Sequence, residues 1–246
     1  MAGADDDQPA RTRGRRLWLR GAIFLVVVAG TALAFRQGLI TRRFNPLPDL
    51  NLSEPNPWFV DWRLAAIKNN RDVCARTLQS PHIDAKPIPD SPMKDGCGWI
   101  NSVRLVSAGG VRASFDKLTC ESAVALALWL EHDVQPAAQR MLGQHVVAIR
   151  SLGSYACRNI VGNPLWKRLR SQHASANAAD VAGFTLANGR HISVERQWHG
   201  DSAETRFLHA VHDGACRYFR VVIGPDYNAA HYNHFHLDRG PYTLCR

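Results

Sequence analysis

Residues 180–194, DVAGFTLANGRHISV, decide the fold class that the sequence predicts. Asn188-Gly189 stands between two apolar runs, and this dipeptide is a strong signal for a tight turn between antiparallel strands. Further strands are expected at 145–157, 216–224 and 233–238, whereas the earlier part of the chain shows helical spacing. Helices first and strands later predict an α+β domain with a small antiparallel sheet flanked by helices.

The boundaries of the helices can be predicted from capping residues. Thr119 can cap a helix over residues 120–132. Pro136 suits the first turn of a second, short helix, which Gly143 would end. Residues 80–98 contain many prolines and glycines, so we expect no regular element there.

The N-terminal residues differ in composition from the rest of the chain. An uncharged run covers residues 21–35, and the apolar residues 17–19 lengthen it towards the roughly 20 residues that a membrane span needs. Arginines are more numerous before the run than after it, which predicts a cytoplasmic tail over 1–16 and a transmembrane anchor over 17–36. A cleavable signal peptide is the alternative, since Ala32–Ala34 fits a small-residue cleavage site.

Both alternatives place most of the chain outside the cytoplasm. The first predicts a single-pass protein of the inner membrane with a periplasmic C-terminal domain, and the second predicts secretion after cleavage. Residues 37–60 are rich in Pro and Asn and are typical of an extended linker. Residues 61–246 then form the globular domain.

The cysteines agree with an oxidising compartment. All of them follow the apolar run, and their number is even, which predicts up to three disulfides. None forms a C-x-x-C pair, so a cysteine-type zinc finger is not expected. The sequence does not choose among the possible pairings. The candidates are Cys74, Cys97, Cys120, Cys157, Cys216 and Cys245.

The charge of the chain restricts its partners only weakly. The formal net charge is +9, and the N-terminal residues carry about half of it. A mildly basic exported domain suits an anionic cell-wall polymer. No arginine-rich helix or aromatic-basic repeat is present, so we expect no nucleic-acid partner. The sequence leaves the oligomeric state open.

The histidines of HYNHFHLD, residues 231–238, could supply metal chemistry. Residues two apart in a strand share a face, so His234 and His236 would project together while Phe235 turns into the core. His231 would face the other way if the strand began early enough. The paired imidazoles could provide one metal ligand and one neighbouring acid or base, although structurally hydrogen-bonded histidines give the same pattern.

A second segment contains further ligand types. In SQHASANAAD, residues 171–180, His173 and Asp180 are both competent zinc ligands. The small residues between them would let the backbone fold tightly around an ion.

These segments resemble motifs of known zinc peptidases. Residues 171–180 resemble the S-x-H-x-x-G-x-A-x-D signature of the D-alanyl-D-alanine carboxypeptidases, which the lysostaphin, D-Ala-D-Ala and Hedgehog superfamily shares in looser form. Residues 234–236 resemble the H-x-H of that superfamily. GSYACR, residues 153–158, resembles its arginine-bearing S-G-Y-R loop.

Over residues 58–246 the chain is similar to the bacterial extensin-like protein C-terminal family. The similarity lies in GCGWINSVRL, LTCESAVALALWL, VQPAAQRMLG, GSYACRN and GACRYFRVVIGPDYNAAHYNHFHLD, and in the N-terminal anchor. This resemblance implies a fold like that of Hedgehog and the D-Ala-D-Ala peptidases. It also implies a hydrolase that cleaves peptide amide bonds of peptidoglycan, or of another cell-wall polymer, through a zinc-bound water.

The resemblance also implies roles for individual residues. His173, Asp180 and His236 would bind Zn²⁺. His234 would be a nearby base or electrostatic stabiliser, and Arg158 would stabilise an oxyanion or hold a substrate carboxylate. Two residues would lie in an outer shell around the metal, namely Ser171 and His231.

Four positions depart from these patterns, one of them Ala179, where the extensin-like family commonly has an aliphatic residue. Ala176 replaces the signature glycine, which would strain the backbone if that position needs a positive φ. Gln172 and Asn233 stand where the extensin-like family commonly has Glu and Asp. The alternative function is therefore a non-catalytic cell-envelope protein that binds the wall and keeps the fold, with or without the metal.

Overall fold

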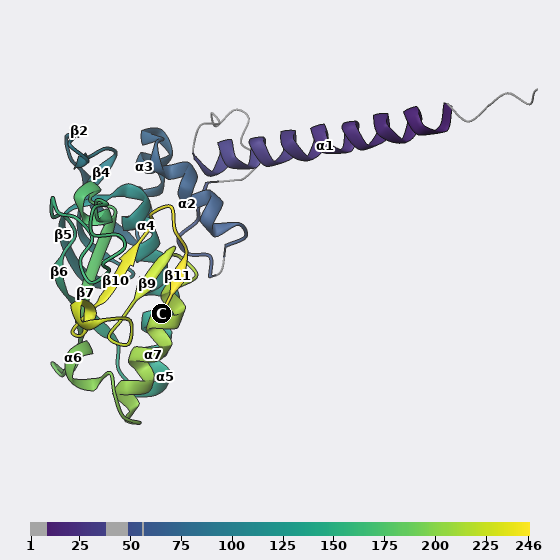
Figure 1. Cartoon of the computed structure of the whole chain (residues 1–246). Coiled ribbons are helices and arrows are strands. Elements are labelled where there is room, and N and C mark those ends of the chain that lie inside the picture. Colours follow the sequence, from purple (N-terminus) through teal and green to yellow (C-terminus); the bar gives the residue numbers. More distant parts are fainter. Residues whose placement is uncertain (1–8, 38–48, 56) are drawn as a thin grey trace, which may run out of the picture.

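The computed structural model describes residues 9–37, 49–55 and 57–246. The predicted cytoplasmic tail and the predicted linker therefore lie partly outside the described residues. Figure 1 shows a folded α+β region and one long helix, α1 (Pro9–Arg36), that projects from it. The described residues confirm a mixed α+β fold with a mostly antiparallel sheet.

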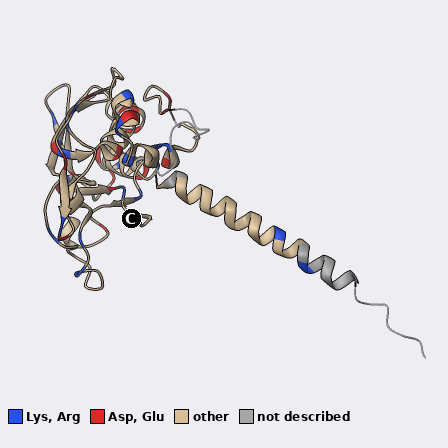
Figure 2. Ribbon diagram, turned by 90° about the horizontal axis from the view of Figure 1, so that it is seen from above, with Lys and Arg blue, Asp and Glu red and all other residues tan. Residues whose placement is uncertain are grey.

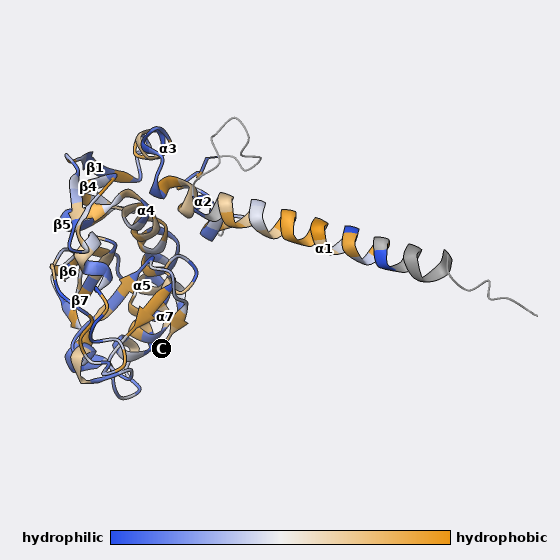
Figure 3. Cartoon of the chain, turned by 45° about the horizontal axis from the view of Figure 1, so that its top comes forward, coloured by the Kyte–Doolittle hydropathy of each residue, from blue (hydrophilic) through white to orange (hydrophobic). Residues whose placement is uncertain are grey.

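The helix α1 is apolar along much of its length, as the orange colour in Figure 3 shows. Its segment Leu17–Ala34 has 18 residues and is not buried against the folded region. Such a helix is about 27 Å long, close to the roughly 30 Å of a bilayer core. Among the residues of α1 that Figure 2 describes, the basic ones lie in the half of the helix farther from the folded region. By length and composition α1 could cross a membrane, and a signal sequence would pass the same test.

The predicted hairpin lies at the centre of the sheet. Its strands are β7 (Ala178–Leu186) and β8 (His191–Ser193), and its turn contains Gly189 at φ 82°. The first half of β7 pairs with β10 (Phe235–Asp238), and the second half pairs with β8. The other edge of β7 pairs with β6 (Val146–Gly153). All three pairings are antiparallel, so β7 anchors the C-terminal half of the domain.

The other strands extend the sheet on both sides of β7. In the described part of the chain nine strands form it, in the order β1-β4-β5-β6-β7-β10-β9-β11 with β8 paired to β7. The β5·β6 and β9·β11 pairs are parallel, so the sheet is larger and less uniform than expected. The flanking strands are β1 (Ile83–Pro87), β4 (Ser102–Ala108), β5 (Val111–Thr119), β9 (Val221–Ile223) and β11 (Leu244–Cys245).

The prediction that residues 80–98 form no regular element is wrong. This segment contains β1 and a separate two-stranded ribbon of β2 (Ser91–Lys94) and β3 (Cys97–Trp99). Gly98 makes the ribbon possible, because a Cβ atom there would lie 2.5 Å from the Ser91 carbonyl oxygen. Glycine here permits close approach of two strands and does not mark a loop.

A continuous helical segment packs against the sheet. It begins with the buried helix α4 (Cys120–Trp129), whose predicted cap, Thr119, accepts a backbone hydrogen bond at 3.3 Å. A π-helical turn, η2 (Leu130–Val134), leads directly into α5 (Gln135–Leu142). Gly143, at φ 63°, ends the segment as predicted. The remaining helices are α2 (Val60–Lys68), α3 (Arg71–Thr77), η3 (Gln172–Ser175), α6 (Val194–Gln197), α7 (Ala203–Ala215) and η4 (Ala229–His231).

Three disulfides cross-link the folded region and confirm the prediction. They join Cys74 to Cys120, Cys97 to Cys157, and Cys216 to Cys245. They span 46, 60 and 29 residues. A cross-link of such length stabilises a fold by about 4 kcal/mol in the chain-entropy description. The pairing of Cys97 with Cys157 also ties the small ribbon to the loop after β6.

Candidate metal centre

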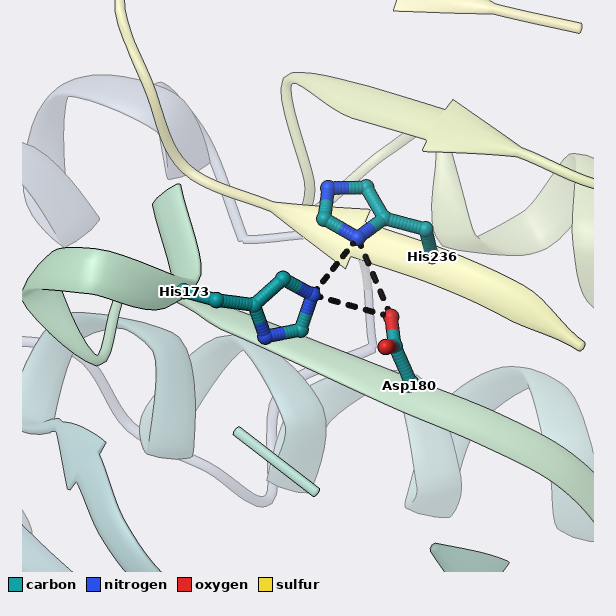
Figure 4. A group of neighbouring side chains, drawn as sticks. All are labelled: His173, Asp180 and His236. Carbon is teal, nitrogen blue, oxygen red and sulfur yellow. Dashed lines mark hydrogen bonds and ion pairs between the residues drawn. The ribbon is translucent and has the colours of Figure 1, made fainter. Parts of the chain in front are cut away.

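Three metal-ligand side chains meet where β7 and β10 pair. His173 lies on η3, Asp180 near the start of β7, and His236 on β10, where it is directly opposite Asp180. Figure 4 shows the three side chains pointing toward one common point. The structure therefore brings together the three residues that the sequence resemblance names as zinc ligands.

The ligand atoms of this triad form a nearly equilateral triangle. His173 Nε2 lies 3.1 Å from His236 Nδ1 and 3.2 Å from Asp180 Oδ1, and the last two atoms are 3.0 Å apart. All three residues are buried, with 3 to 8% of each exposed. Nitrogen and oxygen ligands of tetrahedral zinc lie about 2.0–2.2 Å from the ion and hence about 3.3–3.6 Å from one another. The triangle is only slightly smaller than zinc requires.

Two outer contacts select the tautomers of the triad histidines. His173 Nδ1 lies 3.1 Å from the Ser154 carbonyl oxygen, which can only accept a hydrogen bond. His236 Nε2 likewise donates to Asp238 Oδ2 at 3.0 Å. In their neutral forms both rings therefore present a lone pair to the centre of the triangle. Such outer partners are typical of metal-binding histidines.

Lone pairs that face one another repel, so this arrangement is stabilised by a positive charge at its centre. Burial would lower the pKa of His236, but hydrogen bonds to Asp180 and Asp238 raise it to about 9. Burial would raise the pKa of Asp180, whereas hydrogen bonds from His173 and His236 hold it well below its usual range. Without a metal, a proton on His236 supplies the positive charge. A divalent cation would do the same and satisfy all three lone pairs.

The turn that carries His173 depends on Ser171 and Ala176. The Ser171 side chain accepts a hydrogen bond from the His173 backbone N–H at 3.3 Å. Ala176 ends the turn at φ 54°, in the left-handed region. The position of the signature glycine therefore does need a positive φ, and the methyl group costs about 1–2 kcal/mol of backbone strain. The Ala176 carbonyl accepts from the Thr119 backbone N–H at 2.8 Å, which holds the turn in place.

Gln172 belongs to a polar network rather than to the triad. Its Oε1 accepts a hydrogen bond from Asn177 Nδ2 at 3.1 Å. Asn177 Oδ1 in turn accepts from the hydroxyls of Thr119 and Ser122 at the start of α4. Gly240 lies close by, where a Cβ atom would come within 2.7 Å of the Gln172 side chain. In this chain residue 172 therefore links η3 to α4.

His234 reaches the triad from a turn, not from a strand. β10 begins at Phe235, so the prediction that His234 and His236 share a strand face is wrong, although Phe235 is buried in the core as predicted. His234 Nε2 nevertheless lies 3.6 Å from Asp180 Oδ1. Its Nδ1 lies 2.8 Å from Asn233 Oδ1. Burial lowers the pKa of His234, which favours the neutral ring near pH 7. Donation from Nδ1 to the Asn233 side-chain oxygen then leaves the lone pair on Nε2.

His231 lies nearer to the site than the strand pattern predicted. Its ring centroid is 5.3 Å from that of His234 and 5.7 Å from that of His236. Its Nδ1 contacts Asn228 Oδ1 at 2.8 Å. Burial and the charges of the neighbouring histidines lower the pKa of His231 to about 4. The residue was expected to face away because it would alternate along a strand, but it stands at the end of η4.

A cavity of about 470 Å³ opens beside the triad. His231, His236 and Asp238 form part of its wall, and Arg158 lies in the same wall. Within the described residues the Arg158 guanidinium has no carboxylate partner. The stacked rings of Trp166 and Tyr242, with centroids 5.0 Å apart, contribute to the apolar part of the lining. Arg170 lines the same cavity and bonds only the Asp95 carbonyl and the Asn159 side-chain oxygen. The cavity thus combines two arginines that have no carboxylate partner among the described residues with an apolar wall.

Sequence reasoning missed two residues of this site. Asp238 holds His236 Nε2, and its other oxygen accepts from the Gly240 backbone N–H at 2.7 Å. A signal was present, because residues 236 and 238 share a face of the same strand. The second missed residue is Ser154, whose backbone carbonyl accepts from His173 Nδ1. Because this contact is made by the backbone, no side-chain pattern could have identified it.

Comparison with known proteins adds one finding. Residues 72–246 match the family described as Extensin-like protein C-terminus, which is more than half of the chain. Neither the curated proteins nor the solved structures contain a significant match.

Proposed function

The chain belongs to the Extensin-like protein C-terminus family, and from this premise and the triad geometry we propose that it is a zinc-dependent peptidase. Its substrates would be amide bonds in the peptides of peptidoglycan or another cell-wall polymer. The observation that carries the proposal is the convergence of three buried ligand atoms from His173, Asp180 and His236. An oxygen atom accepts a hydrogen bond from the other ring nitrogen of each histidine and so orients both rings. The motif resemblance to the D-Ala-D-Ala carboxypeptidase, lysostaphin and Hedgehog superfamily supports the same chemistry and a fold of that kind.

His173, Asp180 and His236 would hold the ion. When bound, zinc would lower the pKa of a coordinated water to about 7 and polarise the carbonyl group of the scissile amide. The Ser154 carbonyl and Asp238 would keep both histidines in the ligating tautomer. The site would therefore need little reorganisation when it is loaded.

His234 is the residue placed to move a proton. It is neutral near pH 7, and its free Nε2 lies beside Asp180 at the edge of the triad. It could take a proton from the attacking water and return it to the leaving amine. Asn233 holds the opposite nitrogen and so keeps Nε2 available.

Arg158 is the residue placed to bind negative charge from the substrate. It lines the same cavity as His236 and has no ion-pair partner among the described residues. A planar guanidinium suits a substrate carboxylate, or the oxyanion that develops when an amide is attacked. We assign the substrate peptide to this cavity.

Metal analysis and product analysis test the proposal. The purified full chain, loaded with zinc and dialysed, should retain one equivalent, and His173→Ala should lose it. His191→Ala is a matched control, because His191 is exposed and lies on β8. With peptidoglycan fragments, wild-type protein should release a peptide or amino acid that His236→Ala does not release. Equal release by both proteins would refute the peptidase.

A non-catalytic wall-binding protein is the second candidate, and Asn233 favours it. An aspartate there would stabilise the protonated form of His234 more strongly than the neutral amide does, because it adds a negative charge. The outcome that supports this candidate is stoichiometric zinc and retention on peptidoglycan without any release of product.

We further propose that α1 is an uncleaved membrane anchor, with its arginine-rich end in the cytoplasm and the folded region in the periplasm. The three disulfides support an oxidising compartment for the folded region. Resistance of the full chain to alkaline carbonate extraction tests the anchor. Protease accessibility in spheroplasts tests the orientation.

A further inference from the structure

Three aromatic residues are exposed together at the start of α2. Trp58, Phe59 and Trp62 have exposed fractions of 79%, 59% and 36%. Adjacent ring centroids are 6.4 and 6.3 Å apart, so the three rings form one cluster, which we call the aromatic patch. Scattered single apolar residues are ordinary on protein surfaces, but a contiguous group of large aromatic rings marks an interaction site.

The fold itself gains little from this patch. Phe59 has φ 53° and precedes α2 without supplying a side-chain cap. A bulky residue in the left-handed region is strained, and strain of this kind persists where function requires the conformation. The backbone here is fixed, since the Phe59 carbonyl accepts from the backbone N–H groups of Trp62 and Arg63 at 3.0 Å.

The patch lies on the side of the folded region from which α1 projects. Figure 1 shows the loop before α2 and the start of α2 beneath the inner end of α1. Asn69, at the end of α2, donates from Nδ2 to the Gln37 carbonyl at 2.9 Å. Since α2 has nine residues and is about 14 Å long, the patch lies close to the point where the apolar helix ends.

The described segment before the patch is fastened to the domain. Asp49 pairs with Arg76 at 2.7 Å, and its carbonyl accepts from Arg63 at 2.7 Å. Residues 38–48 can span at most about 40 Å even if fully extended. If α1 crosses a membrane, residues 38–48 limit the distance between residue 49 and that membrane to about 40 Å, and the contact between Asn69 and Gln37 holds the end of α2 nearer still.

Further contacts hold the same segment in place. Leu52 is buried, and its carbonyl contacts His132 Nε2 at 2.7 Å. Ser53 Oγ contacts His82 Nε2 at 2.9 Å, and His82 Nδ1 lies 2.7 Å from Glu131 Oε1. The segment before the patch is therefore part of the domain surface, so the patch keeps a fixed position relative to the rest of the domain.

We infer that the aromatic patch rests in the lipid headgroup layer of the same bilayer that α1 spans. The two tryptophans favour this layer, because the indole ring has an apolar body and a polar N–H, and Phe59 adds apolar surface between them. Contact at α1 and at the patch would fix the tilt of the domain and hence the direction in which the cavity opens. The inference rests on the proposed membrane span of α1.

Fluorescence quenching by brominated lipids tests the patch. The full chain carrying Trp18→Phe, which removes the tryptophan of α1, is reconstituted in vesicles of phosphatidylcholine and phosphatidylglycerol brominated near the headgroup. We expect clear quenching relative to unbrominated vesicles. Adding Trp58→Phe and Trp62→Phe should abolish most of it, because these changes remove the reporters and keep aromatic rings. Adding Trp166→Phe is the matched control and should leave the quenching unchanged.

Two outcomes would overturn the inference, and they can be told apart. If the Trp18→Phe chain withstands alkaline carbonate but shows no quenching, or if Trp166→Phe alone removes the quenching, the patch does not face the lipid although α1 is inserted. If the chain is extracted by carbonate, the membrane span itself fails, and the inference fails with it. The zinc and product measurements above are independent of both results.

Discussion

His236 and His234 stand two residues apart, yet their surroundings give them opposite protonation. His236 has the carboxylates of Asp180 and Asp238 on its two nitrogens, and its pKa rises to about 9. His234 has the neutral amide of Asn233 on Nδ1, and burial lowers its pKa. The difference shows that the identity of the hydrogen-bond partner, rather than the histidine spacing, decides which of the two imidazoles is protonated near pH 7 when no metal is bound.

Removal of a triad ligand should have the largest effect. His236→Ala removes one of three ligand atoms, so zinc affinity should fall by more than the roughly 100-fold that outer contacts can produce. Competition with a chromogenic chelator measures this affinity. His191→Ala should leave it unchanged. Equal loss in both variants would show that general unfolding, not ligation, causes the effect.

Replacement of the carboxylate behind His236 should have the next largest effect. In Asp238→Asn the tautomer of His236 is no longer enforced, so zinc affinity should fall by about 10- to 100-fold. The same chelator competition applies, with exposed Asp201→Asn as the control. Unchanged affinity would mean that Asp238 serves the fold and not the metal.

A carboxylate beside His234 should remove the contrast between the two histidines. In Asn233→Asp the pKa of His234 should rise above its wild-type value, because a negative charge favours the imidazolium. NMR titration of the zinc-loaded chain measures this pKa. If the peptidase proposal holds, cleavage of peptidoglycan fragments should increase, by about 10-fold. Asn163→Asp, which adds the same charge elsewhere in the cavity wall, should not reproduce the increase.

The smallest effect is expected at Ala176. A glycine there would relieve about 1–2 kcal/mol of left-handed strain. It would also lose a buried methyl group worth about 0.8 kcal/mol and add entropy to the unfolded chain. Ala176→Gly should therefore change the free energy of unfolding by less than about 1 kcal/mol, as measured by urea denaturation, and leave zinc affinity intact. A larger destabilisation would mean that the strain is absent.

Local sequence signals predicted the parts of this fold that depend on neighbouring residues. The Asn188-Gly189 turn, the Thr119 cap and the Gly143 terminus all follow from backbone preferences within a few residues, and all three are confirmed. The ribbon over residues 91–99 was missed, because close approach at Gly98 resembles a loop signal. The cysteine pairing was undetermined, since it depends on distant contacts.

The candidate site, too, could be predicted only where it depends on neighbouring residues. Ligand types at 173, 180 and 236 are visible in the sequence, although the triangle they form exists only because β10 pairs with β7 in one register. The start of β10 at Phe235 and the position of His231 on η4 depend on the turn before the strand, so alternation along a strand misplaced both histidines. The Ser154 contact is made by backbone and has no sequence signal.

The disulfide between Cys97 and Cys157 has a consequence for maturation. Cys157 directly precedes Arg158, so the bond that closes the ribbon onto this loop also limits where the arginine can lie. A newly made chain in a reducing compartment would lack this tether while it could still pair β7 with β10. If the peptidase proposal holds, oxidative folding would then be the step that fixes the position of Arg158 in the cavity wall. Under the proposed function and the proposed membrane orientation, this dependence on oxidation would keep the domain inactive towards cytosolic peptides.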